Sequence, residues 1–267
     1  VKVRLAKTAG FCMGVRLAME KVLAEANKAE DPIHTFGPLI HNRQVMKLLA
    51  SKGVRAVETV EGVPRGTVVI RAHGIPPGER KDLKATGLRI IDATCPRVAR
   101  VQAIVRSHTR KGYTAVIVGE PEHAEVIGLR GYAEGPVQVI ERVEQVEDLP
   151  ADGPLVVVAQ TTQDAGVFEE IRRAIEVRNP RALIFDTICD ATQNRQAEVA
   201  SFAGHVDGMV VVGGFHSGNT RRLVQVSEAA GMTTFHVETE AELDREALAP
   251  MGTVGVTAGA STPNWMI

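Results

Sequence analysis

The feature that most constrains the fold is a threefold repeat, in which an apolar segment ends in a cysteine and a helical segment follows. Cys12, Cys95 and Cys189 each stand at such a junction. The next apolar segment ends in a glycine 25, 24 and 24 residues after the respective cysteine, at Gly37, Gly119 and Gly213. Self-similarity along a chain is the signature of a repeated architecture. The sequence therefore predicts three similar α/β units.

Each repeat also places polar side chains directly after its apolar segments. These residues are His41 and His73 in the first repeat, His123, Thr161 and Thr162 in the second, and Ser217, Asn219 and Ser261 in the third. In open parallel sheets, ligands bind outside the carboxyl ends of the strands. We therefore expect the cysteines and these polar residues to face one central site with near-threefold symmetry. The alternative is three ordinary α/β layers whose loops resemble one another.

Amphipathic helices are expected to alternate with the short apolar strands, as a parallel sheet requires. The predicted helices are Arg16–Glu30, Arg43–Lys52, Val98–Lys111, Asp164–Arg178, Gln193–Gly204 and Arg221–Ala230. The fold class is thus α/β, with three small domains. Their expected boundaries are residues 1–95, 96–186 and 187–267, which divide the chain at strand ends and not at long linkers.

Composition excludes several classes of function. The 267 residues carry a formal net charge of −1, so no global field attracts nucleic acid or a membrane surface. Aromatic residues make up only 4%, which argues against platforms for stacking bases. No apolar run approaches the roughly 20 residues that span a bilayer. We see no secretory signal, and three cysteines cannot all be paired, so we expect reduced thiols and a cytoplasmic location.

Three cysteines in matched settings indicate three thiolates that bind one metal group. Structural zinc usually takes four ligands, often from closely spaced cysteine pairs, and no such pair is present. Iron–sulfur clusters favour thiolates, and a [4Fe–4S] cluster with three cysteines leaves one iron without a protein ligand. A predicted helix start also favours the thiolate form. Buried structural cysteines are the remaining alternative.

The polar loop residues call for a different ligand. Histidines, hydroxyls, an amide and glycine-rich backbone around one cavity suit a phosphate or a diphosphate. The glycine-rich stretch from Gly213 to Thr220 precedes a helix, so its backbone N–H groups are also suited to bind an anion. Glu125 lies two residues after His123, and a carboxyl near the Thr161 hydroxyl is able to relay protons to a leaving group.

The motifs around these residues match one known family. They are Gly10–Val15, Gly37–Asn42, Arg71–Gly74, Asp92–Pro96, His123–Gly128, Gln160–Thr162, Ile188–Gln196, Ser217–Leu223 and Thr257–Pro263. Together they resemble the 4-hydroxy-3-methylbut-2-enyl diphosphate reductase family, over essentially the whole chain. One departure is Gly218, where the family commonly has serine, so only the backbone N–H at this position is available.

The resemblance implies a cloverleaf of three α/β domains around one [4Fe–4S] cluster. It implies that Cys12, Cys95 and Cys189 ligate the cluster. It also implies that the diphosphate is bound by His41, His73, His123, Ser217, Asn219 and Ser261. Glu125 would deliver protons and Thr161 would orient the substrate hydroxyl.

The implied reaction is the reductive dehydroxylation of (E)-4-hydroxy-3-methylbut-2-enyl diphosphate to isopentenyl and dimethylallyl diphosphate. This is the last step of the methylerythritol phosphate (non-mevalonate) route to isoprenoids. Electrons would come from a carrier such as ferredoxin or flavodoxin. Three other functions use similar residues: a non-redox hydratase or dehydratase with the same cluster, an iron–sulfur sensor, and a zinc-binding structural protein.

Overall fold

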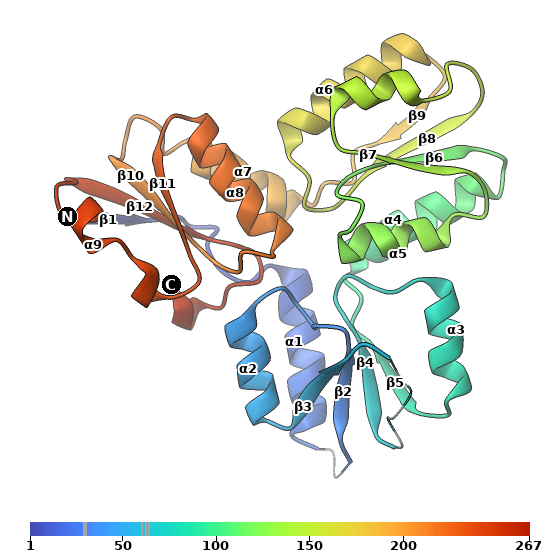
Figure 1. Ribbon diagram of the computed structural model, residues 1–267, viewed down its shortest axis with the longest axis horizontal. Helices are drawn as coiled ribbons and strands as arrows, with labels where there is room; N and C mark the ends of the chain where they lie inside the picture. The colour runs from blue at the N-terminus through green and yellow to red at the C-terminus, as the bar shows by residue number, and fades with distance from the viewer. Residues whose placement is uncertain (29–30, 60, 62, 64) are drawn as a thin grey trace. The chain divides into compact units, whose positions relative to one another are not determined.

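The strands of the protein form three four-stranded sheets, each with helices around it (Figure 1). The structure is a computed structural model that describes residues 1–28, 31–59, 61, 63 and 65–267. Within these residues every pairing between strands is parallel. The prediction of an α/β protein built from three similar sheets is therefore confirmed.

The chain divides into two compact units. The terminal unit comprises Val1–Arg16, Ile40–Lys47 and Cys189–Ile267, and the central unit comprises Leu17–Leu39 and Leu48–Ile188. The terminal unit contains one of the sheets and the central unit contains the other two. Helices α1 (Met13–Ala26) and α2 (Arg43–Ser51) begin in the terminal unit and continue into the central one.

The sheet of the terminal unit has the strand order β1-β12-β10-β11. Its strands are β1 (Lys2–Leu5), β12 (Thr253–Ala258), β10 (Gly208–Val212) and β11 (Thr233–Val237). It is accompanied by α7 (Asp190–Ala200), α8 (Gly218–Ala229), the short α9 (Arg245–Leu248), and 3₁₀ turns at Glu240–Glu242 and Asn264–Met266. Strand β10 is buried on both faces: Met209 and Val211 join one hydrophobic cluster, while Val210 and Val212 join another. This accounts for its unbroken apolar sequence.

The pairing of β1 differs from the predicted domain boundaries. β1 lies beside β12, with Lys2 opposite Thr253 and Leu5 opposite Val256. The first strand of the chain therefore belongs to the sheet of the last segment, and not to a domain of residues 1–95. The short and exposed sequence of β1 carries no signal for its partner, because parallel partners can lie far apart in sequence.

The first sheet of the central unit has the order β3-β2-β4-β5. Its strands are β3 (Val54–Val57), β2 (Ile33–Phe36), β4 (Thr67–Ile70) and β5 (Arg89–Asp92), and α3 (Pro77–Ala85) connects the last two. Val68, Ile70, Ile75 and Leu83 form its core. The packing between α3 and β4 thus rests on the few apolar residues of an otherwise polar helix.

The second sheet of the central unit has the order β7-β6-β8-β9. Its strands are β7 (Val137–Ile140), β6 (Thr114–Val118), β8 (Leu155–Ala159) and β9 (Leu183–Phe185); its helices are α4 (Pro96–Thr109), α5 (Ala124–Tyr132) and α6 (Ala165–Arg178), with a 3₁₀ turn at Val143–Asp148. β6 and β8 are buried on both faces, and their side chains alternate between two hydrophobic clusters. Helix α3 contacts α5, which joins the two sheets of this unit.

The six predicted helices correspond to α1, α2, α4, α6, α7 and α8, with shifts at their ends. α1 ends at Ala26, and Glu30, the predicted end, lies outside the described residues. Helices α3, α5 and α9 and strands β3, β7 and β11 were not predicted. α3 buries only Leu83, so its sequence lacks the apolar periodicity that indicates a helix.

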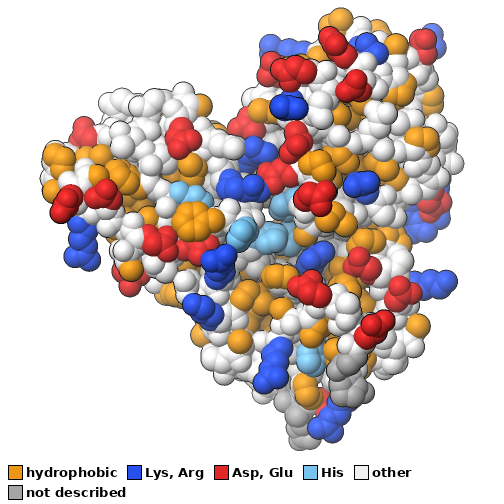
Figure 2. Space-filling view, viewed as in Figure 1, with side chains coloured by type: hydrophobic (Ala, Val, Ile, Leu, Met, Phe, Trp, Pro, Cys, Tyr) orange, Lys and Arg blue, Asp and Glu red, His pale blue; other side chains and the backbone are white. Residues whose placement is uncertain are grey.

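The distribution of charged side chains on the surface agrees with the expected charge balance. Acidic and basic side chains are interspersed over the face of the described residues that Figure 2 shows. Among the described residues, no helix combines the length and the apolar character that crossing a membrane requires.

A matched pair of substitutions tests whether the β6–β8 core stabilises the central unit. We expect Val158→Ala to lower the free energy of unfolding by about 2 kcal/mol, because two buried methyl groups are lost and a cavity remains. The control is Val177→Ala on α6, where the side chain is 85% exposed and no loss is expected. Urea unfolding followed by circular dichroism measures both; equal midpoints would contradict the assigned core.

Candidate functional site

Two of the three cysteines lie in the terminal unit, each at the start of a helix. Cys189 is the residue before α7, and its side chain does not cap the helix. Cys12 directly precedes α1, and the Val15 backbone N–H donates a hydrogen bond to its Sγ at 3.4 Å. Both thiols are half-buried and neither is in a disulfide. Each sulfur thus lies beside the backbone N–H groups of a helix start, which lack partners within the helix.

Three of the predicted polar residues are joined by hydrogen bonds in the terminal unit, and a fourth bonds to the backbone beside them. The Ser261 hydroxyl donates to the His41 carbonyl oxygen at 3.2 Å and contacts the Ser217 hydroxyl at 3.4 Å. The Asn219 side-chain oxygen accepts from the Ala260 N–H at 2.8 Å. Ser217, Asn219 and Ser261 are all buried. The structure therefore brings His41, Ser217, Asn219 and Ser261 together.

These residues surround the start of helix α8. Ser217 is the N-cap residue, and its hydroxyl accepts from the Thr220 N–H at 3.3 Å. Gly218 begins the helix and contributes only backbone, as expected from its sequence. At Gly214 a side chain would meet the His41 carbonyl oxygen at 2.7 Å, so only glycine allows this close approach. A helix start of this kind favours an anion.

The third cysteine lies in the central unit, at the junction of two strands. Cys95 is the residue before α4, and its side chain does not cap the helix. Its backbone N–H donates to the Ala72 carbonyl oxygen at 2.9 Å, which fixes it beside the segment that carries His73. The thiol is half-buried and is not in a disulfide. The paired ends of β4 and β5 thus hold a cysteine and a histidine together.

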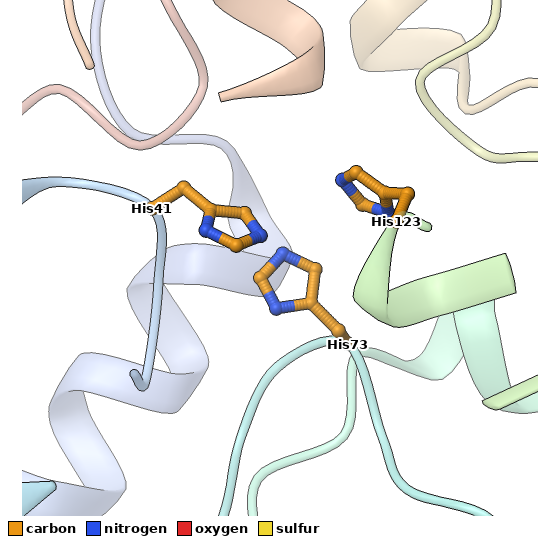
Figure 3. A group of neighbouring side chains, drawn as sticks. All are labelled: His41, His73 and His123. Atoms are coloured by element: carbon orange, nitrogen blue, oxygen red, sulfur yellow. The ribbon is translucent and has the colours of Figure 1, made fainter. Parts of the chain in front are cut away.

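His123 lies close to His73 in the same unit. The two rings meet edge to face, with their centroids 5.4 Å apart and their planes at 82° (Figure 3). His123 is the N-cap residue of α5, and its Nδ1 accepts from the Glu125 N–H at 3.2 Å. This bond leaves Nε2 of the His123 ring as the nitrogen directed away from the helix start. Figure 3 also draws His41, which belongs to the terminal unit.

Glu125 and Thr161 form a buried pair in the central unit. The Glu125 side chain is 1% exposed and accepts two hydrogen bonds from Thr161, from the backbone N–H and from the hydroxyl, each at 2.7 Å. Burial raises the pKa of Glu125 to about 7, although the two bonds from Thr161 act in the opposite direction. A carboxyl group with this pKa carries a proton near neutral pH and is suited to general acid catalysis.

Sequence reasoning missed some polar residues that shape these sites. Asn42 is buried, donates from Nδ2 to the Ser261 carbonyl oxygen at 3.0 Å, and accepts from the Val45 N–H at 3.0 Å. Gln160 donates to the Thr162 hydroxyl at 2.8 Å and accepts from the Glu120 N–H at 3.0 Å. Both residues lie within the family motifs, which was the signal available in the sequence. Their partners Ser261 and Glu120 are distant in sequence and could not be predicted.

Comparison with known proteins gives a match over the whole chain. The LytB protein family profile matches residues 3–267. A protein of Geobacter sulfurreducens named 4-hydroxy-3-methylbut-2-enyl diphosphate reductase is 42% identical over 267 residues, which cover 100% of this chain and 94% of that protein. A protein of Nitratidesulfovibrio vulgaris (strain DSM 19637 / Miyazaki F) with the same name is 45% identical over 271 residues, with 100% and 96% coverage.

Two solved structures agree with this result. The E-1-hydroxy-2-methyl-but-2-enyl-4-diphosphate reductase of Plasmodium falciparum has a TM-score of 0.95 at 30% identity, covering 99% of this chain and 85% of that one. A structure described as (E)-4-hydroxy-3-methyl-but-2-enyl diphosphate reductase, the terminal enzyme of the non-mevalonate pathway, has a TM-score of 0.72 at 39% identity, covering 100% and 96%. The resemblance that the motifs indicate is therefore confirmed: the chain belongs to the LytB protein family.

Proposed function

We propose that this protein is a 4-hydroxy-3-methylbut-2-enyl diphosphate reductase. The reaction consumes the allylic hydroxyl group, two electrons and two protons, and releases water with isopentenyl and dimethylallyl diphosphate. The observation that carries the proposal is the Glu125–Thr161 pair, a buried acid with a pKa of about 7, in a chain that matches named reductases over its full length.

The proposal assigns Cys12, Cys95 and Cys189 as the ligands of one [4Fe–4S] cluster per chain. Three features support this fit: all three are half-buried thiols, none is in a disulfide, and each stands at a helix start. When bound, the cluster would supply the electrons and a Lewis-acidic iron that lacks a protein ligand.

We assign diphosphate binding to the buried hydroxyl and amide groups around the start of α8 and to the histidines. Ser217, Asn219 and Ser261 supply neutral donors, and the α8 helix start adds backbone N–H groups. His41, His73 and His123 complete the proposed set. Binding energy from this remote group would hold the reacting hydroxyl in place, so that it is used for orientation and not only for affinity.

We assign proton delivery to Glu125. Its two hydrogen bonds from Thr161 fix both carboxyl oxygens, so the proton has a defined position in the central unit. Thr161 would also orient the hydroxyl group of the substrate through its own Oγ1. With a proton from Glu125, the group that leaves is water and not hydroxide, which lowers the cost of breaking the C–O bond.

The proposal also includes an external electron donor. The substrate is reduced in this reaction and cannot supply the two electrons itself. A one-electron carrier such as ferredoxin or flavodoxin would therefore reduce the protein twice per turnover. It further includes a cytoplasmic location, where thiols stay reduced.

The cluster assignment predicts a spectroscopic loss. Each of Cys12→Ser, Cys95→Ser and Cys189→Ser should remove most of the broad visible absorbance and the bound iron and sulfide after anaerobic reconstitution, because each change deletes a thiolate ligand. Iron and sulfide analysis measures the result. A variant with full cluster content excludes that cysteine as a ligand, and zinc without iron or sulfide would reject the cluster altogether.

Glu125→Gln tests the proton donor. Turnover should fall by 10²–10⁴-fold, the usual effect of losing a general acid, while cluster content stays unchanged. In the unaltered protein, the raised pKa keeps the carboxyl protonated below about pH 7, so turnover should fall as the pH rises above 7. The residual turnover of the variant should lack this dependence.

Glu134→Gln is the matched control for Glu125. Glu134 is an acid of the same unit that pairs with Arg106 and Arg110 near the surface. We expect its loss to leave turnover and the pH profile unchanged. A Glu125→Gln variant with normal turnover would remove Glu125 from the mechanism.

A pair of histidine substitutions tests the diphosphate site. His41→Ala should raise the dissociation constant of the allylic diphosphate at least tenfold, because one donor to the anion is lost. His205→Ala is the control, since His205 is an exposed histidine of the same unit. Titration of the cluster absorbance with the substrate measures both constants, and equal constants would contradict the assignment.

A further inference from the structure

Helix α7 holds the loop that leads to Cys12, and it carries Cys189 at its start. The Glu198 carboxylate accepts from the backbone N–H groups of Lys7 and Thr8 at 2.7 and 2.8 Å. Arg195, one turn closer to Cys189, donates from one terminal nitrogen to the Gly10 carbonyl oxygen at 2.7 Å. The carboxylate of Glu198 and the guanidinium group of Arg195 therefore fix the loop before Cys12 to α7.

The second terminal nitrogen of Arg195 reaches the other cysteine segment. It donates to the Ala191 carbonyl oxygen at 2.8 Å, two residues after Cys189. Its partner on the first side, Gly10, lies two residues before Cys12 and has φ +106°, a conformation that favours glycine. A single guanidinium group thus bridges the backbone of the Cys12 segment and that of the Cys189 segment.

Arg195 is buried and incompletely satisfied. The residue is 5% exposed, and its Nε finds no hydrogen-bond partner within the part of the chain that the structure describes. Burial lowers the pKa of Arg195, while the nearby Cys12 and Cys189 sulfurs and Glu198 raise it. A buried cation with an unpaired N–H donor is costly unless a negative group compensates it.

We propose that Arg195 is a positioning residue for Cys12 and Cys189, which ties their segments together and supplies a buried positive charge and an unpartnered Nε donor beside them. This inference rests on the proposed function, because it takes both sulfurs as cluster ligands. It adds a residue to which the sequence motifs assign no role. It also accounts for the buried Nε that has no hydrogen-bond partner among the described residues.

The physical effect is on electron affinity. Reducing a cluster adds negative charge, and a nearby cation or a hydrogen bond to sulfur stabilises that charge. The interaction is strong because the guanidinium is buried away from water. Arginine suits this role better than lysine, because its planar fork can hold two carbonyl groups and still present a third N–H.

The test is the midpoint reduction potential of the reconstituted protein, measured by anaerobic redox titration. Arg195→Gln removes the charge, and we expect a shift to a more negative potential. Arg195→Lys keeps the charge but loses the fork, so a smaller shift in the same direction is expected. Hydrogen exchange of the segment around Gly10 should become faster in both variants.

Glu198→Gln is the matched control, because it loosens the same loop without removing the positive charge. We expect faster exchange at Lys7 and Thr8 without a shift to a more negative potential, because losing a carboxylate does not make reduction harder. An equal shift in this variant would attribute the effect to loop mobility and overturn the proposal.

An unchanged potential in Arg195→Gln would also overturn it. If Arg195→Gln holds no cluster, an unchanged potential in Arg195→Lys would overturn the proposal instead. Failure of the cluster assignment, on which this inference rests, is distinguishable, because the unaltered protein would then contain no iron and sulfide.

Discussion

Parallel pairing is the constraint on which the sites of this protein depend. In each sheet the strands end at the same edge, so the loops that follow them gather there. The hydrogen bond from the Cys95 N–H to the Ala72 carbonyl oxygen is the clearest case, since it extends the β4–β5 ladder just far enough to place a cysteine beside His73. The polar residues of the loops need no separate scaffold, because the ladder already fixes where their backbone lies.

The helix starts that follow the strands determine which charges the loops at the strand ends favour. Cys95, Cys189, His123 and Ser217 each occupy the position just before a helix, where backbone N–H groups lack partners within the helix. Such positions favour negative charge, and the proposed function uses them for thiolates and for a diphosphate. Glu125, in the first turn of α5, differs: its burial outweighs its donors, and it keeps a proton near neutral pH.

Much of this arrangement could be predicted from the sequence, and the remainder has physical reasons. The apolar runs of β6, β8 and β10 could be recognised because both faces of those strands are buried. The cysteine before each main helix could be recognised as well. The edge strands β3, β7 and β11 were not predicted, because Arg55, Gln138 and His236 interrupt their apolar sequences.

The side-chain partners of the site were the least predictable part. The bonds of Arg195 to Gly10 and of Asn42 to Ser261 join positions far apart in the chain, so neither periodicity nor spacing could indicate them. The pairing of Glu125 with Thr161 was anticipated in kind, as a carboxyl near a hydroxyl. The depth of its burial, which sets the pKa, became visible only in the packed structure.

The partnership of β1 with β12 has a consequence for how the molecule is made. A growing polypeptide emerges from the ribosome in the direction from β1 to β12, so β1 has no partner until all strands of the central unit have been synthesised. Both sheets of the central unit have all their strands once Phe185 has emerged, so they can assemble during translation. The terminal unit can close only after β12 has emerged, later than either sheet of the central unit, which delays any pocket that it contributes.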